Sequence, residues 1–300
     1  MAGLMKPSVL RTGGMILPAV LFIGVFFLIP LALMGYVSVQ ERGEFGSVAW
    51  GTFTLEAYER FFFERDFLDD SLVLNADYAQ IFVRTFLLSI GTTVLCLVIA
   101  FPTALYMAMQ PPATRNWLIF LVTIPFWTNL LVRNYAWILL LRNGGLIDGW
   151  FGALGLSSGP LNLLYTDFSL AVGLTYSFLP FMVLPIYASL EKLDFRLVEA
   201  AYDLGADKWR ALRHVIVPFA MPGIAAGCVL VFIPCLGSYV TPELLGGGKR
   251  LMIGSLIQNQ FGSSRNWPFG SALSFALLAL VLVTMMLYLL RYRSAPQVAK

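Results

Sequence analysis

Charge is scarce in this sequence, and the scarcity indicates the class of protein. Charged residues make up 12% of the 300 positions and hydrophobic residues 58%, and the mean hydropathy is +0.77. Soluble domains carry about 25% charged residues. Several apolar runs also reach the roughly 20 residues that a helix needs to cross a bilayer. We therefore predict an all-α integral membrane protein.

The side chains that usually perform catalysis or bind metals are also scarce. His214 is the single histidine, and the three cysteines lie in apolar runs without a CxxC pair: Cys96, Cys228 and Cys235. The stretch Gly246–Arg250 resembles part of a phosphate-binding loop, but Glu243 stands at the first glycine position of that motif and Arg250 at its closing Ser or Thr. We therefore expect no catalytic site, no metal site and no cofactor in this chain, and we do not expect an enzyme.

Six apolar runs are predicted to be transmembrane helices: residues 14–39, 80–108, 116–141, 168–190, 219–240 and 268–290. The first follows Lys6 and Arg11 and is too long for the core of a signal peptide, so we expect an uncleaved span. A cytoplasmic N-terminus places eleven Lys and Arg residues inside and seven outside, as the positive-inside rule favours. Both termini and the loop at 191–217 are then cytoplasmic. The net charge of +3 follows from this excess, so we expect lipid, and no nucleic acid, as a partner.

The first outer loop, residues 41–79, is acidic. Nine Asp and Glu residues face three arginines, for a net charge of −6. The segment also contains the aromatic stretch FTLEAYERFFF, so we expect a small folded or interfacial element. Its charge indicates either a solvated acidic face or a surface that attracts a cation or a basic partner.

The loop at 191–217 differs from its apolar surroundings because it reads as two short charged helices. In the first, Leu197, Ala200, Ala201 and Leu204 share one face, while another carries Arg196, Glu199 and Asp203. Gly205 stands where a left-handed C-terminal cap is expected, Asp207 can cap the second helix, and Pro218 marks the end of that helix and the start of the fifth span. Either the pair lies on anionic lipid, or the first helix inserts into a groove of a partner whose basic residues meet Glu199 and Asp203.

The loop resembles the EAA motif of ATP-binding-cassette (ABC) importer permeases. The resemblance rests on Glu199, Ala200 and Ala201, on Gly205 six positions after Glu199, and on Val215, Val217 and Pro218. The family pattern favours Ile and Leu at the two valine positions. In that family the motif is the coupling segment that docks onto a separate ATPase subunit. The resemblance therefore implies that ATP and Mg²⁺ bind to a partner and not to this chain.

A narrower resemblance points to the spermidine/putrescine importer permeases. It covers most of the chain from about residue 80, in the stretches IPFWTNLLVRNYAW (124–137), LPFMVLPIYASLEKLD (179–194), MPGIAAGCVLVFIP (221–234), PELLGGGK (242–249) and RNWPFGSA (265–272). The resemblance implies a second permease in a heterodimer, two ATPase subunits, an extracytoplasmic substrate-binding protein and location in the bacterial inner membrane. The acidic outer loop agrees with a polycationic cargo.

Arg133 lies within the third predicted span, where an unpaired charge is costly. Asn129, Arg133 and Trp137 recur at four-residue spacing, which indicates either a polar stripe along the translocation pathway or an arginine that pairs with a loop carboxylate or reaches the interface. A cationic cargo would not bind an arginine, so we expect a gate or a brace. Polyamine contacts are expected from aromatic and acidic side chains, although these also suit packing or an interfacial belt: Trp127, Tyr135, Tyr176, Tyr239 and Glu243.

The sequence thus predicts one transmembrane permease domain over residues 1–300, in the type I ABC importer fold, with an acidic extracytoplasmic loop at 41–79 and a coupling loop at 191–217. A permease for another small solute remains open. An ion-coupled secondary transporter is the rival from another class, but it would need carboxylates within the membrane or an internal repeat. No acidic residue lies near the middle of a predicted span, and no internal repeat is visible in the sequence. A membrane-surface scaffold is a weaker third alternative.

Overall fold

The structure is a computed structural model that describes residues 7–43, 46–65, 72–74, 76–156 and 159–293. These residues divide into two compact units. Unit 1 falls within residues 1–76 and 257–278, and unit 2 within residues 77–256 and 279–300. We describe each unit by itself, and the expectation of one permease domain over the whole chain stays a prediction.

Unit 1 begins with the first predicted span and continues into the acidic loop. Its elements are α1 (Pro7–Ser38), β1 (Gln40–Arg42), β2 (Val48–Phe53), α2 (Glu56–Glu59), β3 (Phe63–Arg65) and β4 (Leu72–Leu74), together with the first half of α13 (Trp267–Arg293). β1 pairs antiparallel with β2, and β3 with β4. The prediction of a small folded element is therefore confirmed, whereas a strictly all-α fold is wrong, because β-branched and aromatic residues in this loop form two short hairpins.

Polar contacts tie the loop together. The hydroxyl groups of Ser38 and Tyr58 lie 2.9 Å apart, and Gln40 Oε1 accepts a hydrogen bond from the backbone N–H of Gly51 at 2.9 Å. Arg42 donates to the carbonyl of Ser264 at 3.1 Å, which links the loop to the segment before α13. Four of the nine acidic residues lie outside the described residues: Glu44, Asp66, Asp69 and Asp70.

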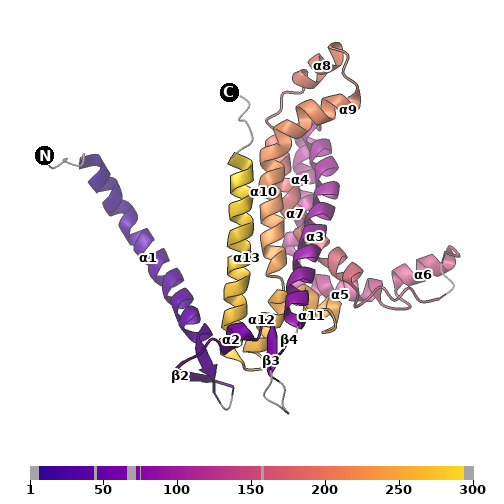
Figure 1. Ribbon diagram of the computed structural model, residues 1–300. Helices are drawn as coiled ribbons and strands as arrows, with labels where there is room; N and C mark the ends of the chain where they lie inside the picture. Colours follow the sequence, from indigo (N-terminus) through magenta and orange to yellow (C-terminus); the bar gives the residue numbers. More distant parts are fainter. Residues whose placement is uncertain (1–6, 44–45, 66–71, 75, 157–158, 294–300) are drawn as a thin grey trace. The chain divides into compact units, whose positions relative to one another are not determined.

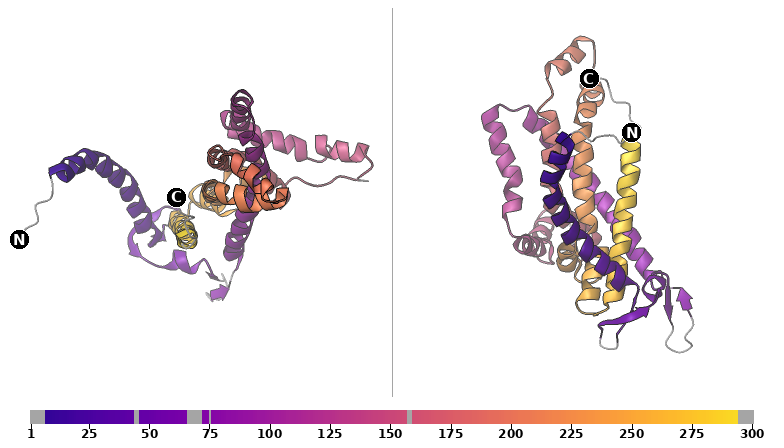
Figure 2. Two further views of the ribbon diagram at one scale, coloured as in Figure 1. Left: turned by 90° about the horizontal axis from the view of Figure 1, so that it is seen from above. Right: turned by 90° about the vertical axis from the view of Figure 1, so that its left-hand side faces the viewer.

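Unit 2 contains most of the helices (Figures 1 and 2). They are α3 (Asp77–Ala108), α4 (Pro112–Trp127), α5 (Leu130–Leu141), α6 (Leu146–Ala153), α7 (Asp167–Leu190), α8 (Arg196–Asp203), α9 (Lys208–Ala211), a π-helical turn (Leu212–Ile216), α10 (Val217–Leu236), α11 (Val240–Gly246), α12 (Ile253–Phe261), which runs on into unit 1, and the second half of α13.

The core of unit 2 is centred on α7, which packs against α3 and α10 along its length. Small residues allow close approach of α7 and α10. At Gly223, any side chain would collide with the carbonyl of Pro185 and with the backbone of Ile186, so only glycine fits without a shift. In a bilayer such close backbone contact supplies much of the packing energy, because lipid offers helices no hydrophobic reason to associate.

Five described helices are long and apolar enough to cross a membrane: Leu17–Ser38 of α1, α3, α7, the continuous helix Lys208–Leu236, and Trp267–Tyr288 of α13. The predicted third span, 116–141, is not one straight helix. It is split into α4 and α5, and the chain bends by 92° between Pro112–Trp127 and Leu130–Ala153. The number of spans is six only when this bent pair is counted as one.

Candidate functional site

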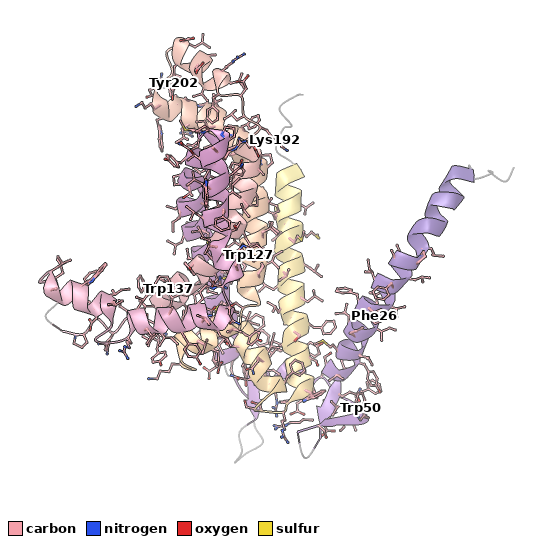
Figure 3. All side chains as sticks on the ribbon, turned by 180° about the vertical axis from the view of Figure 1, so that it is seen from behind. Phe26, Trp50, Trp127, Trp137, Lys192 and Tyr202 are labelled. Carbon is pink, nitrogen blue, oxygen red and sulfur yellow. The ribbon has the colours of Figure 1, made fainter. Side chains whose placement is uncertain are left out.

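The predicted coupling loop lies at one end of unit 2, where α8 and α9 extend beyond the ends of α4, α7 and α10 (Figure 1). Figure 3 labels Tyr202 on α8 and Lys192 just after α7 at this same end. The opposite end of the unit carries α5, α6 and α11 (Figures 1 and 2). Two regions predicted to function in transport therefore lie at opposite ends of the same bundle.

Local sequence signals define the ends of α8 and α9. Gly205 has a φ of +84°, and it follows α8 in the left-handed conformation that was predicted. Its N–H donates to the carbonyl of Tyr202, and the N–H of Ala206 donates to that of Ala201, each at 2.9 Å, which is the hydrogen-bond pair of a Schellman C-cap. Asp207 Oδ1 accepts from the N–H of Arg210 at 2.7 Å and caps α9, also as predicted.

The buried face of α8 is narrower than the sequence suggested. Val198 is buried in the core, and Ala201 packs against the same core, so Ala201 turns toward this chain. Leu197, Ala200 and Leu204 remain exposed, as do Glu199 and Asp203. Ala201 is half-buried on the side of α8 where Val198 contacts the core, whereas Ala200 lies on the exposed side.

The exposed side of the loop is unusually apolar for a charged segment. Leu204 is 90% exposed and Trp209 70%, and Leu197 and Tyr202 are also largely exposed. Between α8 and the following helix lies an open hollow of about 300 Å³, lined by Ala201, Leu204, Gly205, Ala206, Arg210, Ala211, His214 and Val215. Exposed apolar residues next to a hollow and flanked by charges are typical of a protein-docking surface.

Pro218 does not interrupt the chain between the loop and the membrane. α9 passes through the π-helical turn into α10, so that Lys208–Leu236 forms one helix of 29 residues. The predicted boundary at Pro218 is therefore wrong as a break. In the wider turn the N–H of Val217 donates to the carbonyl of Leu212, five residues back, and the proline is accommodated next to it in the first turn of α10.

At the other end, the chain breaks between α4 and α5 at two extended residues, Thr128 and Asn129. The side chain of Asn129 accepts from the N–H of Leu131 at 2.8 Å and so caps α5. Thr128 Oγ1 donates to the carbonyl of Pro125 at 2.9 Å. The break is thus built by side chains that satisfy the exposed backbone groups of both helix ends. Asn129 precedes α5, so the predicted stripe on one helical face does not begin there.

Arg133 spans the break. Its Nη1 donates to the carbonyl of Pro125 at 3.1 Å, and its guanidinium carbon lies 5.9 Å from the ring centroid of Tyr176 on α7. The ring of Trp137 meets the same tyrosine edge to face, with centroids 5.7 Å apart. Among the described residues no carboxylate pairs with Arg133. Of the predicted pathway residues, the fold therefore brings Arg133 and Tyr176 together, with Trp137.

The remaining predicted pathway residues have exposed side chains. Trp127 is 83% exposed at the end of α4 (Figure 3), and Tyr135 on α5 is 55% exposed. Tyr239, the N-cap of α11, and Glu243 within α11 are both exposed. The helix α11 packs against α5 and α7. Among the residues that the structure describes, no three His, Cys, Asp or Glu side chains are grouped as metal ligands would be.

Two ion-pair groups were not anticipated. Arg84 Nε donates to Asp167 Oδ1 at 3.1 Å, and Arg250 lies 3.9 Å from the same carboxylate, near the α11 end. At the start of the predicted coupling loop, Arg115 lies 3.3 Å from Glu191. Each group joins residues far apart in the sequence, so only a prediction of which helices are neighbours would have found them.

Comparison with known proteins identifies the family. The family described as "Binding-protein-dependent transport system inner membrane component" matches residues 100–299. The chain belongs to this family. It is accordingly a multi-pass component of an inner membrane.

Two transport permeases and one solved transporter are similar to this chain. The spermidine/putrescine transport system permease protein PotB of Haemophilus influenzae is 40% identical over 88% of this chain and 87% of that protein. PotB of Escherichia coli is 38% identical, over 79% of this chain and 82% of that protein. A crystal structure of a bacterial ABC transporter that imports the acidic polysaccharide alginate has a TM-score of 0.68 at 16% identity, covering 95% of both chains, which concerns the fold alone.

Family membership and the geometry agree on one point. An inner membrane component of such a transport system needs a path through the membrane and a contact with the rest of the system. The break at α4 and α5 and the exposed loop at α8 and α9 supply a candidate for each. The roles of the individual residues in them remain predictions.

Proposed function

We propose that this chain is the permease subunit of an ABC importer for polyamines such as spermidine and putrescine. The observation that carries the proposal is the 40% identity to a permease of that name over most of both chains. The acidic residues of the outer loop support it, because a negative outer surface raises the local concentration of a polycation. ATP and Mg²⁺ then bind to separate ATPase subunits.

In this proposal α8 is the coupling helix. Its exposed face, with Leu197, Ala200 and Leu204 beside Glu199 and Asp203, enters a groove on an ATPase subunit, and the two acids meet basic residues there. The apolar centre supplies burial and the acids supply orientation. Gly205 permits the sharp exit from the groove, and the continuous helix that includes Pro218 carries the motion into the membrane.

The proposal also includes a complete assembly. α4 and the bent α5 count as one span, so that the chain crosses the membrane six times with both termini in the cytoplasm. A second permease pairs with this one as a heterodimer, two ATPase subunits bind from the cytoplasm, and an extracytoplasmic binding protein delivers the cargo. The family description, which names a binding protein, supports the last of these partners. Cargo then passes the aromatic and acidic residues near the break.

The test is reconstitution of the full complex, with its sister permease, ATPase and binding protein, in proteoliposomes. Spermidine or putrescine should accelerate ATP hydrolysis and accumulate inside, and removal of ATP should stop accumulation. Stimulation by a sugar or an anion, but not by a polyamine, would overturn the cargo and leave the importer. Uptake driven by an ion gradient without ATP would instead favour the secondary transporter.

A further inference from the structure

The ring of Tyr176 is already occupied by a cation in this structure. The guanidinium of Arg133 lies 5.9 Å from the ring centroid, within the range of a cation–π interaction. Trp137 forms a second aromatic wall, with its ring at 74° to that of Tyr176. The tyrosine is nevertheless 37% exposed, so part of it is accessible. Aromatic rings of this kind bind organic ammonium groups.

Arg133 is held at this ring by few interactions. Among the described residues, the one hydrogen bond of its side chain is the 3.1 Å bond from Nη1 to the carbonyl of Pro125, and its buried Nε has no partner. Thr128 Oγ1 donates to the same carbonyl at 2.9 Å, so Pro125 keeps a partner when Arg133 moves away. The arginine also lies one turn beyond the extended residues of the break. Its displacement therefore leaves few groups unsatisfied.

We propose that Arg133 occupies the position at which the cargo binds, here called the seat, and that the cargo displaces it. The inference rests on the proposed function, and it names the site at which an alkylammonium group of the cargo binds: the face of Tyr176 with Trp137 beside it. Two cations cannot share one ring face, because they repel each other and compete for the same quadrupole. In the absence of cargo Arg133 closes the site, and arrival of an ammonium group expels it.

The proposal differs from a fixed brace in what it predicts for Arg133. Replacing Arg133 by Gln removes the cation but keeps an N–H that can reach the carbonyl of Pro125. Cargo then meets no competitor, so half-maximal uptake should occur at a spermidine concentration about threefold to tenfold lower, the range expected for loss of a competing cation–π contact. Hydrolysis of ATP without cargo should also rise. A brace predicts that both uptake and hydrolysis fall.

Tyr176 offers a matched pair of variants. Tyr176→Phe keeps the aromatic face, whereas Tyr176→Leu keeps apolar bulk and removes it. In the reconstituted complex we expect Tyr176→Leu to raise the spermidine concentration for half-maximal uptake by about tenfold and Tyr176→Phe to retain most of the wild-type affinity. Equal effects of the two variants would show that the ring face is not the seat and would overturn the inference.

A third measurement decides the matter even if a Tyr176 variant fails to assemble with the ATPase. In the full complex, Arg133→Cys should react with a cationic thiol reagent, and spermidine should slow the reaction at concentrations that support uptake. Absence of protection would contradict the inference. If wild-type complex ignores polyamines altogether, the proposed function fails; if it imports them but the variants behave as a brace predicts, only the seat is wrong.

Discussion

The two ends of unit 2 turn the chain in different ways. Between α8 and α9 the turn is made by residues next to one another, with a left-handed Gly205 and a capping Asp207. Between α4 and α5 the turn occurs inside an apolar run, next to the place where Arg133 lies over a tyrosine of another helix. Residues close together in the sequence determine the first turn, whereas the second depends on packing between helices. The comparison separates features that short-range rules can find from those that need the folded bundle.

The largest effect expected is an all-or-none difference in access from the two sides of the membrane. A cysteine introduced at Lys208 should be protected from a membrane-impermeant thiol reagent added outside intact cells, whereas one at Lys249 should react. Both positions are exposed: Lys208 begins α9 and Lys249 follows α11, two helices that lie at opposite ends of unit 2 (Figure 1). The three native cysteines are replaced first, and the cysteine-free protein serves as the unlabelled control. The reverse labelling would place the predicted coupling loop outside the cell and would contradict the proposed assembly.

Reversal of one charge on α8 should give the next largest effect. Glu199→Lys places a cation where the proposed ATPase surface is basic, and like charges at an interface cost several kcal/mol. We expect co-purification of the ATPase and transport to fall at least tenfold. Glu199→Gln, which removes charge without reversing it, should fall less. If α8 instead lies on lipid, Glu199→Lys would bind anionic vesicles better and transport normally.

The conformation of Gly205 should matter almost as much. A substituent would meet no atom within 4 Å, so any effect of Gly205→Val comes from the left-handed backbone and not from a clash. That conformation costs a non-glycine residue about 1–2 kcal/mol, and more when it is β-branched. We expect weaker binding to the ATPase and slower transport. Gly205→Asn, which tolerates this conformation better, should restore most of both, and equal losses in the two variants would count against the cap.

The cap of α5 provides the equivalent test at the other end. Asn129→Ala removes the acceptor for the N–H of Leu131 and should lower the free energy of unfolding by about 1 kcal/mol. Asn129→Asp keeps an acceptor and should leave the free energy of unfolding unchanged. Thermal unfolding in detergent measures both. A loss of several kcal/mol in Asn129→Ala would mean that the break depends on local capping as strongly as the α8 turn does.

The smallest effects should come from the ion pairs. Arg115→Gln near the coupling loop and Arg84→Gln near the opposite end remove pairs whose side chains are partly exposed. Each should lower the free energy of unfolding by less than about 1 kcal/mol, because solvent screens such pairs. Thermal unfolding at low and high salt checks this. A much larger loss at one end would show that the two ends differ in electrostatic as well as in local design.

Much of this architecture could be predicted from residues alone. Long apolar runs indicated α1, α3, α7, α10 and α13, and capping rules indicated both ends of the α8 turn. The break at Thr128 was missed because the apolar residues on its two sides read as one run, although Asn129 before Leu130 is itself a capping signal. The contact of Ala201 with the core beside Val198 depends on tertiary packing, which spacing within α8 alone does not show. The contact of Arg133 with Tyr176 joins two helices, and no spacing within one helix can reveal it.

The π-helical turn at Leu212–Ile216 holds one residue more than an α-helical turn over the same stretch. Removing one residue there would restore the ordinary pitch and leave the faces of α10 directed at α3 and α7 as before. Removing one from the middle of α10 would instead rotate all that follows by about 100°. Evolution can therefore shorten the chain at this turn without rebuilding the bundle. We expect length differences among members of the family to gather here and to be absent from the helix beyond it.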